Sequence, residues 1–127
     1  MNYSNNRPFL STGKLIENYS LLINYMKKCR EANLNCSDLI PSSEFLLEVK
    51  NLIEIGKITK LRDLVDLVEE KYSELLNCEL ALSVFTELYE HKASCDLVKK
   101  IIITQLAGWI AEMLESLGYV KIKQPWR

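Results

Sequence analysis

Apolar residues recur every three or four positions along most of the chain. In the first such stretch the spacings are four, three and four, at Leu15, Tyr19, Leu22 and Met26. This spacing places the four side chains on one face of an α-helix. Five stretches show the pattern, with first and last apolar residues at 15–26, 45–53, 61–76, 80–89 and 97–117. The pattern predicts an all-α fold, a compact bundle of four to five helices.

Residues with known preferences for helix ends mark the boundaries of these stretches. Ser42, Thr59 and Ser94 stand where three of them begin, and their hydroxyl oxygens can accept a hydrogen bond from an exposed N–H of the first turn. Gly56 and Gly118 stand where two of them end, and glycine reaches the left-handed conformation of a helix C-terminus at little cost. These residues predict the ends of the helices.

A chain of 127 residues is long enough to bury a hydrophobic core. We expect one helical domain over 1–127, with 1–10 as a flexible N-terminal segment because it is mostly polar. The isoleucines at 101–103 are β-branched, which favours a break or a late start in the fifth helix. The predicted core includes Leu22, Leu64, Val68, Phe85, Leu88, Ile102, Leu106 and Ile110.

The residues after Gly118 differ from the rest of the chain. Apolar and basic residues alternate over 119–123, which makes this the only plausible strand, and the chain then ends in Trp126 and Arg127. We therefore allow for at most one short C-terminal β-segment beside the helices.

Four cysteines are present, and none stands in a Cys-x-x-Cys pair: Cys29, Cys36, Cys78 and Cys95. Cysteines inside helical patterns usually behave as small apolar residues, so we interpret them as reduced and structural. The alternative is a pair of disulfides in a secreted chain. The N-terminal residues lack the basic head and apolar run of a signal peptide, and no apolar stretch could span a bilayer. We expect a soluble cytoplasmic protein with no membrane partner.

Charge is unevenly distributed, although the net charge is only −1. Residues 1–40 carry +2, residues 41–95 carry −5 and residues 96–127 carry +2. Such a bipolar chain suits a partner that is itself patterned in charge, because complementary charges set specificity and association rate.

The sequence contains little that predicts catalysis. His91 is the single histidine, and Glu87 stands four residues before it, where the two side chains could form a helix-end pair. The four glycines form no phosphate-binding loop, and neither a serine nucleophile elbow nor a zinc-ligand spacing is present. We therefore expect no enzyme, no cofactor, no metal and no small-molecule substrate.

The stretch 104–120 joins a long helix through Gly118 to a basic segment. It is similar to the helix–glycine–strand passage of helix-turn-helix and winged-helix folds, and similar tails end some primase–helicases of mobile elements. Taken over residues 94–127, the resemblance covers about a quarter of the chain and implies nucleic-acid contact. The chain departs from it in two ways, because a wing needs two strands and because the presumed recognition helix has few basic residues. Contacts to the phosphate backbone are therefore expected rather than base readout.

We predict a non-enzymatic binding protein that contacts nucleic acid or a nucleic-acid-handling complex. Abundant Asn, Lys and Ile fit an accessory protein of a phage or mobile element. The predicted contact residues are Lys99, Lys100, Lys121, Lys123, Trp126 and Arg127.

The alternative is a small helical inhibitor, immunity or adaptor protein that binds a protein partner through an acidic or apolar helix face. The acidic residues that could form such a face are Glu69, Glu70 and Glu74. The same three residues are also expected of an ordinary solvated helix face.

Overall fold

The computed structural model describes residues 7–11 and 18–123, and the side chains of all of these except residue 123. Within these residues the fold is all-α, as the periodicity predicts. The helices are α1 (Ser20–Glu31), α2 (Ser43–Glu54), α3 (Leu61–Tyr72), α4 (Cys78–Tyr89) and α5 (Cys95–Ser116). Two short 3₁₀ turns, η2 (Ser37–Leu39) and η3 (Ser73–Leu75), and two short strands, β1 (Phe9–Ser11) and β2 (Lys121–Lys123), complete the described elements.

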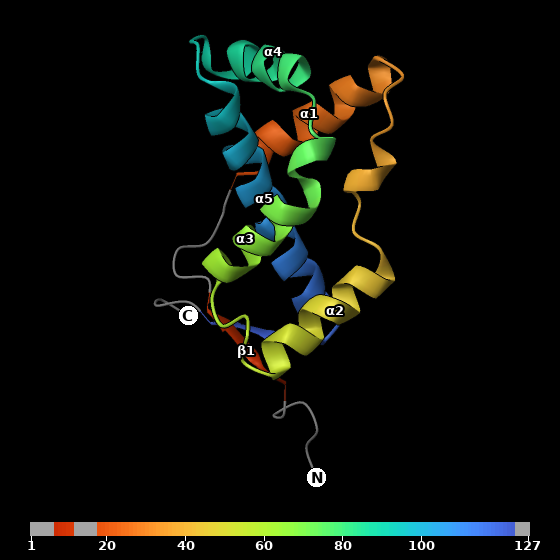
Figure 1. Ribbon diagram of the computed structural model, residues 1–127, viewed down its shortest axis with the longest axis vertical. Helices are drawn as coiled ribbons and strands as arrows, with labels where there is room; N and C mark the ends of the chain where they lie inside the picture. Colours follow the sequence, from red (N-terminus) through yellow and green to blue (C-terminus); the bar gives the residue numbers. More distant parts are fainter. Residues whose placement is uncertain (1–6, 12–17, 124–127) are drawn as a thin grey trace.

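Helix α5 forms the centre of the bundle and contacts each of the other four helices (Figure 1). Ten of its residues are buried, on all sides of the helix. It runs without a break through 101–103, so the expected interruption is wrong. Ile102 and Ile103 are almost completely buried, and the free energy of burying two isoleucines exceeds the small loss of helix propensity of a β-branched residue.

The described helix ends follow the local signals at most of the predicted positions. Ser42 Oγ accepts a hydrogen bond from Phe45 N at 3.1 Å, and Ser94 Oγ accepts one from Leu97 N at 3.2 Å. At the start of α3 the capping side chain is the carboxylate of Asp63, which accepts hydrogen bonds from the N–H groups of Thr59 and Lys60. Thr59 therefore does not cap α3 as predicted. Its own hydroxyl donates to Asp63 as well.

At the start of α1 the N-cap residue Tyr19 makes no side-chain capping hydrogen bond, but Asn18 Oδ1 accepts one from Ser20 N at 2.8 Å. A second acceptor comes from the middle of α5, where Gln105 Oε1 accepts a hydrogen bond from Leu22 N at 2.9 Å. Gln105 is the one buried polar residue of the described core. Because it satisfies an otherwise unpaired buried N–H, it fixes the position of α1 on α5.

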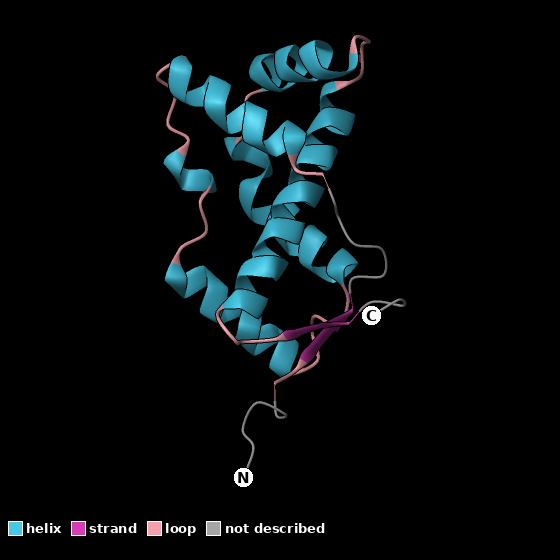
Figure 2. Cartoon of the chain, turned by 180° about the vertical axis from the view of Figure 1, so that it is seen from behind, coloured by secondary structure: helices cyan, strands magenta, loops and turns pink. Residues whose placement is uncertain are grey.

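The two strands pair in parallel, with Phe9 opposite Lys121, at the end of the molecule away from α4 (Figure 2). Ser11 also forms a bridge to Lys60, and its N–H donates to Thr59 O at 3.0 Å. Leu10 lies between these neighbours and is completely buried. Strand β1 thus falls partly inside the segment expected to be flexible.

Seven of the eight predicted core residues are buried. The exception is Leu88, whose side chain is 37% exposed. It lies in the last turn of α4, beyond Ala81, Val84 and Phe85, which are the buried residues of that helix. The apolar stripe therefore continues past the part of α4 that the rest of the chain covers.

All four cysteines form disulfides, Cys29 with Cys36 and Cys78 with Cys95. The interpretation of reduced cysteines is wrong. The Cα atoms of the first pair lie 6.0 Å apart because the chain reverses after α1 at Asn33, whose φ is 57°. The second pair joins the first residue of α4 to the first residue of α5, at a Cα distance of 5.6 Å.

Candidate functional site

The structure separates the residues predicted to contact nucleic acid. Lys99 and Lys100 lie near the start of α5, whereas Lys121 lies in β2 beyond the other end of that helix (Figure 1). Ser116 lies sixteen residues after Lys100, which is about 24 Å along the helix axis. The side chains of the remaining candidates lie outside the described parts, namely Lys123, Trp126 and Arg127. The described lysines thus do not form one basic surface.

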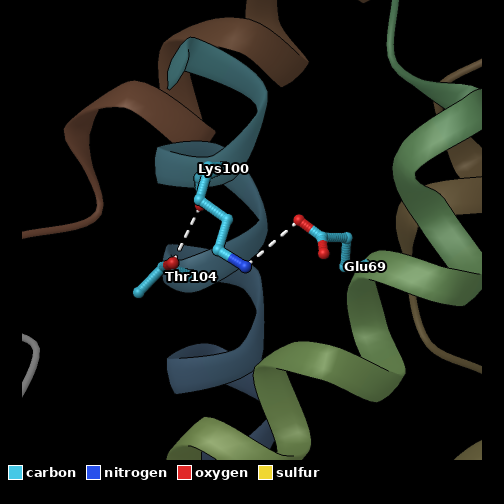
Figure 3. A network of polar contacts seen from close by, with 3 residues as sticks. All are labelled: Glu69, Lys100 and Thr104. Carbon is cyan, nitrogen blue, oxygen red and sulfur yellow. Dashed lines mark hydrogen bonds and ion pairs between the residues drawn. The ribbon is translucent and has the colours of Figure 1, made fainter. Parts of the chain in front are cut away.

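Lys100 is engaged within the fold. Its Nζ lies 3.2 Å from Glu69 Oε2, and this ion pair joins α5 to α3, while Thr104 Oγ1 donates to the carbonyl oxygen of Lys100 at 2.8 Å (Figure 3). Both charged side chains are nearly half exposed, so the pair contributes little free energy. It nevertheless joins one residue from each of the two predicted binding surfaces.

The other two acidic candidates, Glu70 and Glu74, are exposed on α3 and η3. Among the residues that the structure describes, no group of three histidine, cysteine, aspartate or glutamate side chains is placed to hold a metal ion. The arrangement is that of a solvated acidic face.

Glu87 and His91 do not form the expected pair. Helix α4 ends at Tyr89, and Glu90 adopts the left-handed conformation with φ 56°, so His91 does not continue the helical face that carries Glu87. Glu87 instead forms an ion pair with Lys28 of α1 at 3.1 Å. The Nδ1 atom of His91 lies 2.7 Å from the carbonyl oxygen of Tyr89.

A candidate site lies on the outer side of α1. The inner side of this helix carries Leu21, Leu22, Tyr25 and Cys29, which are buried in the core. A second stripe, with spacings of four, three and four, runs along the outer side through Tyr19, Ile23, Met26 and Arg30. The Ile23 side chain is 61% exposed. Helix α1 is therefore apolar on two faces, and the fold covers one of them fully.

A hollow of ≈ 470 Å³ lies beside the second half of this outer stripe. One wall is formed by Ile23, Met26 and Arg30, and the other by the segment that follows α1. Two apolar side chains of that segment, Leu34 and Ile40, are 44% and 53% exposed. The Cys29–Cys36 disulfide ties the segment back to α1 and so holds the second wall in place.

A second hollow of ≈ 290 Å³ lies beside the first half of the stripe, between α1 and α5. Its lining combines Tyr19, Leu22, Ile23 and Met26 with Trp109 and Glu112 of α5. Because Ile23 and Met26 line both hollows, the two adjoin along α1. We call this continuous feature the α1 groove, formed chiefly by Tyr19, Ile23, Met26, Arg30, Leu34, Cys36, Ile40, Trp109 and Glu112.

The two ends of the α1 groove carry opposite charges, Glu112 at one end and Arg30 at the other. The hydroxyl of Tyr19 is buried beside Glu112 but forms no hydrogen bond of good geometry with it. Burial, and then the negative charge of Glu112, raise the pKa of Tyr19 to about 12. The groove is thus apolar at its centre, with one acidic end and one basic end.

Sequence reasoning did not locate this site because it assigned Tyr19, Leu22 and Met26 to a single apolar face, whereas the structure buries Leu22 and leaves Tyr19 and Met26 lining the groove. The available signal was the presence of apolar residues on both sides of the helix, with Ile23 beside Leu22.

No helix in the described parts of the chain is long and apolar enough to cross a membrane.

No family model matches the chain, and neither a characterised protein nor a solved structure is significantly similar to it.

A second surface feature lies at the end of the molecule that carries the strands. The ammonium group of Lys121 lies 5.9 Å from the centre of the Phe9 ring, and that ring is 58% exposed. Tyr119 stands two residues before Lys121, and the ammonium group of Lys50 lies 5.2 Å from the centre of its ring. This surface combines cations with aromatic rings, although Lys50 is also paired with Glu54.

Proposed function

We propose that this protein is a non-enzymatic binding module that docks a protein partner through the α1 groove. One observation carries the proposal: three large apolar side chains that are 44–61% exposed, Ile23, Leu34 and Ile40, line the same groove. Exposed apolar surface that is gathered in a groove and bordered by charge is typical of an interaction site.

The shape and chemistry of the groove favour a helical segment as the docked element. Amphipathic helices place apolar residues at three- and four-residue spacings into such grooves. Met26, at the centre of the groove, has a flexible side chain that adapts to the shape of a partner. This proposal takes up the alternative of an apolar helix face and gives the acidic residues of α3 no part in binding.

The disulfides bear on where the module works. Disulfides persist in oxidising compartments and in the interior of hyperthermophiles, and they are rare in other reducing cytosols. We therefore replace the expected cytoplasmic location with a setting in which Cys29–Cys36 remains oxidised. This disulfide supports one wall of the α1 groove, so the groove needs such a setting to keep its shape.

A charge introduced into the groove tests the proposal. Ile23→Glu places a carboxylate at the centre of the groove, and Ile55→Glu is the matched control, because Ile55 is 65% exposed and lies outside it. Affinity capture with the tagged protein, quantified by mass spectrometry, should identify a partner that Ile23→Glu loses and Ile55→Glu keeps. A partner retained equally by both variants would bind elsewhere and would refute the groove.

Nucleic-acid contact remains a second candidate function, now confined to the surface around β2. It is supported by the exposed Phe9 ring beside Lys121, because exposed aromatic rings next to cations can stack with single-stranded bases. Titration of a labelled single-stranded oligonucleotide at low salt tests it. Phe9→Ala and Lys121→Ala should each weaken binding, whereas Lys27→Ala on α1 should not. Equal binding by all three variants would exclude this surface.

A further inference from the structure

We infer that the partner in the α1 groove is a second copy of this chain, packed antiparallel about a two-fold axis that passes between Ile23 and Met26. The inference rests on the proposed docking function and names the partner for that site. It follows from the symmetry of the outer stripe of α1 and from the charges at the two ends of the groove.

The outer stripe is symmetric in position about its centre. Tyr19 precedes Ile23 by four residues, and Arg30 follows Met26 by four residues. Each end therefore lies about 6 Å along the helix axis from the nearer central residue. When a second copy of α1 runs in the opposite direction across this centre, its Arg30 comes to the Tyr19 end of the first copy.

The Tyr19 end also carries Glu112 of α5. In the antiparallel arrangement Arg30 of each copy therefore faces Glu112 of the other, and the two-fold axis generates this ion pair twice. Neither Arg30 nor Glu112 has an ion-pair partner within the described part of a single chain. A second copy supplies one for each.

The charges also select the direction of packing. In a parallel dimer the two Arg30 side chains would face each other, and so would the two Glu112 side chains. Like charges in contact oppose association, so only the antiparallel arrangement is complementary. A partner of unrelated sequence would need a matching pattern of charge and apolar residues, whereas a second copy already has it.

The centre of the groove fits the same arrangement. The four–three–four spacing of the stripe is the one that lets helices interlock their side chains as knobs into holes. Ile23 and Met26 of each copy enter the hollows beside Met26 and Ile23 of the other. Leu34 and Ile40, at 44% and 53% exposure, then lie at the border of the apolar contact.

Sedimentation equilibrium of the full chain, with its disulfides intact, tests this inference. The wild type should have twice the 14.7 kDa mass of one chain. Arg30→Glu places a glutamate opposite Glu112 at both ends of the interface and should weaken the dimer by about 10- to 100-fold. Glu112→Arg places two arginines together at both ends and should have the same effect. A chain that carries both substitutions restores both ion pairs and should dimerise like the wild type.

Mixing the two single variants gives an independent readout. The Arg30→Glu chain and the Glu112→Arg chain should each be mostly monomeric but should form a heterodimer together, because both cross-pairs are then of opposite charge. Thermal unfolding of each single variant confirms that it is folded. The restoration in the double variant separates a lost contact from a lost fold.

Three results would overturn the inference. The first is a wild type that stays monomeric up to about millimolar concentration. The second is a dimer that Ile23→Glu leaves intact, which would use another surface. The third is a dimer that Ile23→Glu dissociates while both charge variants leave it unchanged, which would be packed differently. In the first two cases, loss of another protein partner in Ile23→Glu but not in Ile55→Glu would still support the docking function.

Discussion

Replacing Cys78 and Cys95 by serine should lower the melting temperature of this protein by about 11 °C. The disulfide joins residues that are 17 apart in sequence. In the chain-entropy description, a crosslink over 17 residues removes about 10 cal/mol/K from the unfolded chain, or about 3 kcal/mol at 25 °C. Cys78 is exposed and Cys95 is partly exposed, so little packing is lost with the sulfur atoms.

The temperature shift follows from the size of the chain. An unfolding entropy of about 2.1 cal/mol/K per residue gives a chain of 127 residues about 0.27 kcal/mol/K. A loss of about 3 kcal/mol then corresponds to about 11 °C. Circular dichroism at 222 nm, recorded during heating in the absence of reductant, measures this shift.

The other disulfide provides a comparison, because the stability lost on its removal includes a contribution from burial as well as from the crosslink. Cys29 and Cys36 are only 7 residues apart, so the crosslink accounts for about 2.4 kcal/mol. Both residues are buried, at 3% and 7% exposure, and buried serine hydroxyls add about 1–3 kcal/mol. The shorter crosslink should therefore cost more when it is removed.

Two observations would refute this reasoning. One is an intact mass showing four free thiols in the protein purified without reductant. The other is a wild-type melting temperature that a phosphine reductant leaves unchanged, which is the result expected for the reduced cysteines inferred from sequence.

Three further changes probe the core and the groove. Gln105→Leu should destabilise the fold by about 1–3 kcal/mol in urea unfolding, because Leu22 N loses its buried acceptor; no change would show that water replaces it. Leu106→Ala should cost about 2–5 kcal/mol by the same assay, since Leu106 is completely buried. Burial raises the pKa of Tyr19 from 10.0 to about 12, so the folded state keeps a phenol proton that the unfolded chain releases above pH 10. Stability should thus be full below pH 10 and fall as pH rises towards 12, and Tyr19→Phe should make that fall shallower.

Much of the helical framework could be predicted from local sequence. Ser42 and Ser94 cap their helices because a serine hydroxyl reaches an N–H only three residues away. Gly56 and Gly118 adopt positive φ values of 79° and 78° at the helix ends where glycine was expected. These features involve residues within one helical turn, so the pattern of neighbouring residues contains the information that determines them.

Other features depend on residues that are distant in sequence. Strand β1 is three residues long and exists through its pairing with β2, more than a hundred residues later. Likewise, Leu22 N of α1 donates to Gln105 of α5, and Lys100 pairs with Glu69 on another helix. No local pattern signals such partners, because the packing of whole helices decides which side chains meet.

The α1 groove shows the same division within one helix. The sequence by itself determines that α1 is a helix with apolar residues on two sides, because side-chain direction follows from helical geometry alone. Only the tertiary structure decides that Leu21, Leu22 and Tyr25 are covered, while Ile23 and Met26 line an open groove. The physical reason is that burial depends on which elements pack against each face, and helices α4 and α5 cover one side of α1 and leave the other open.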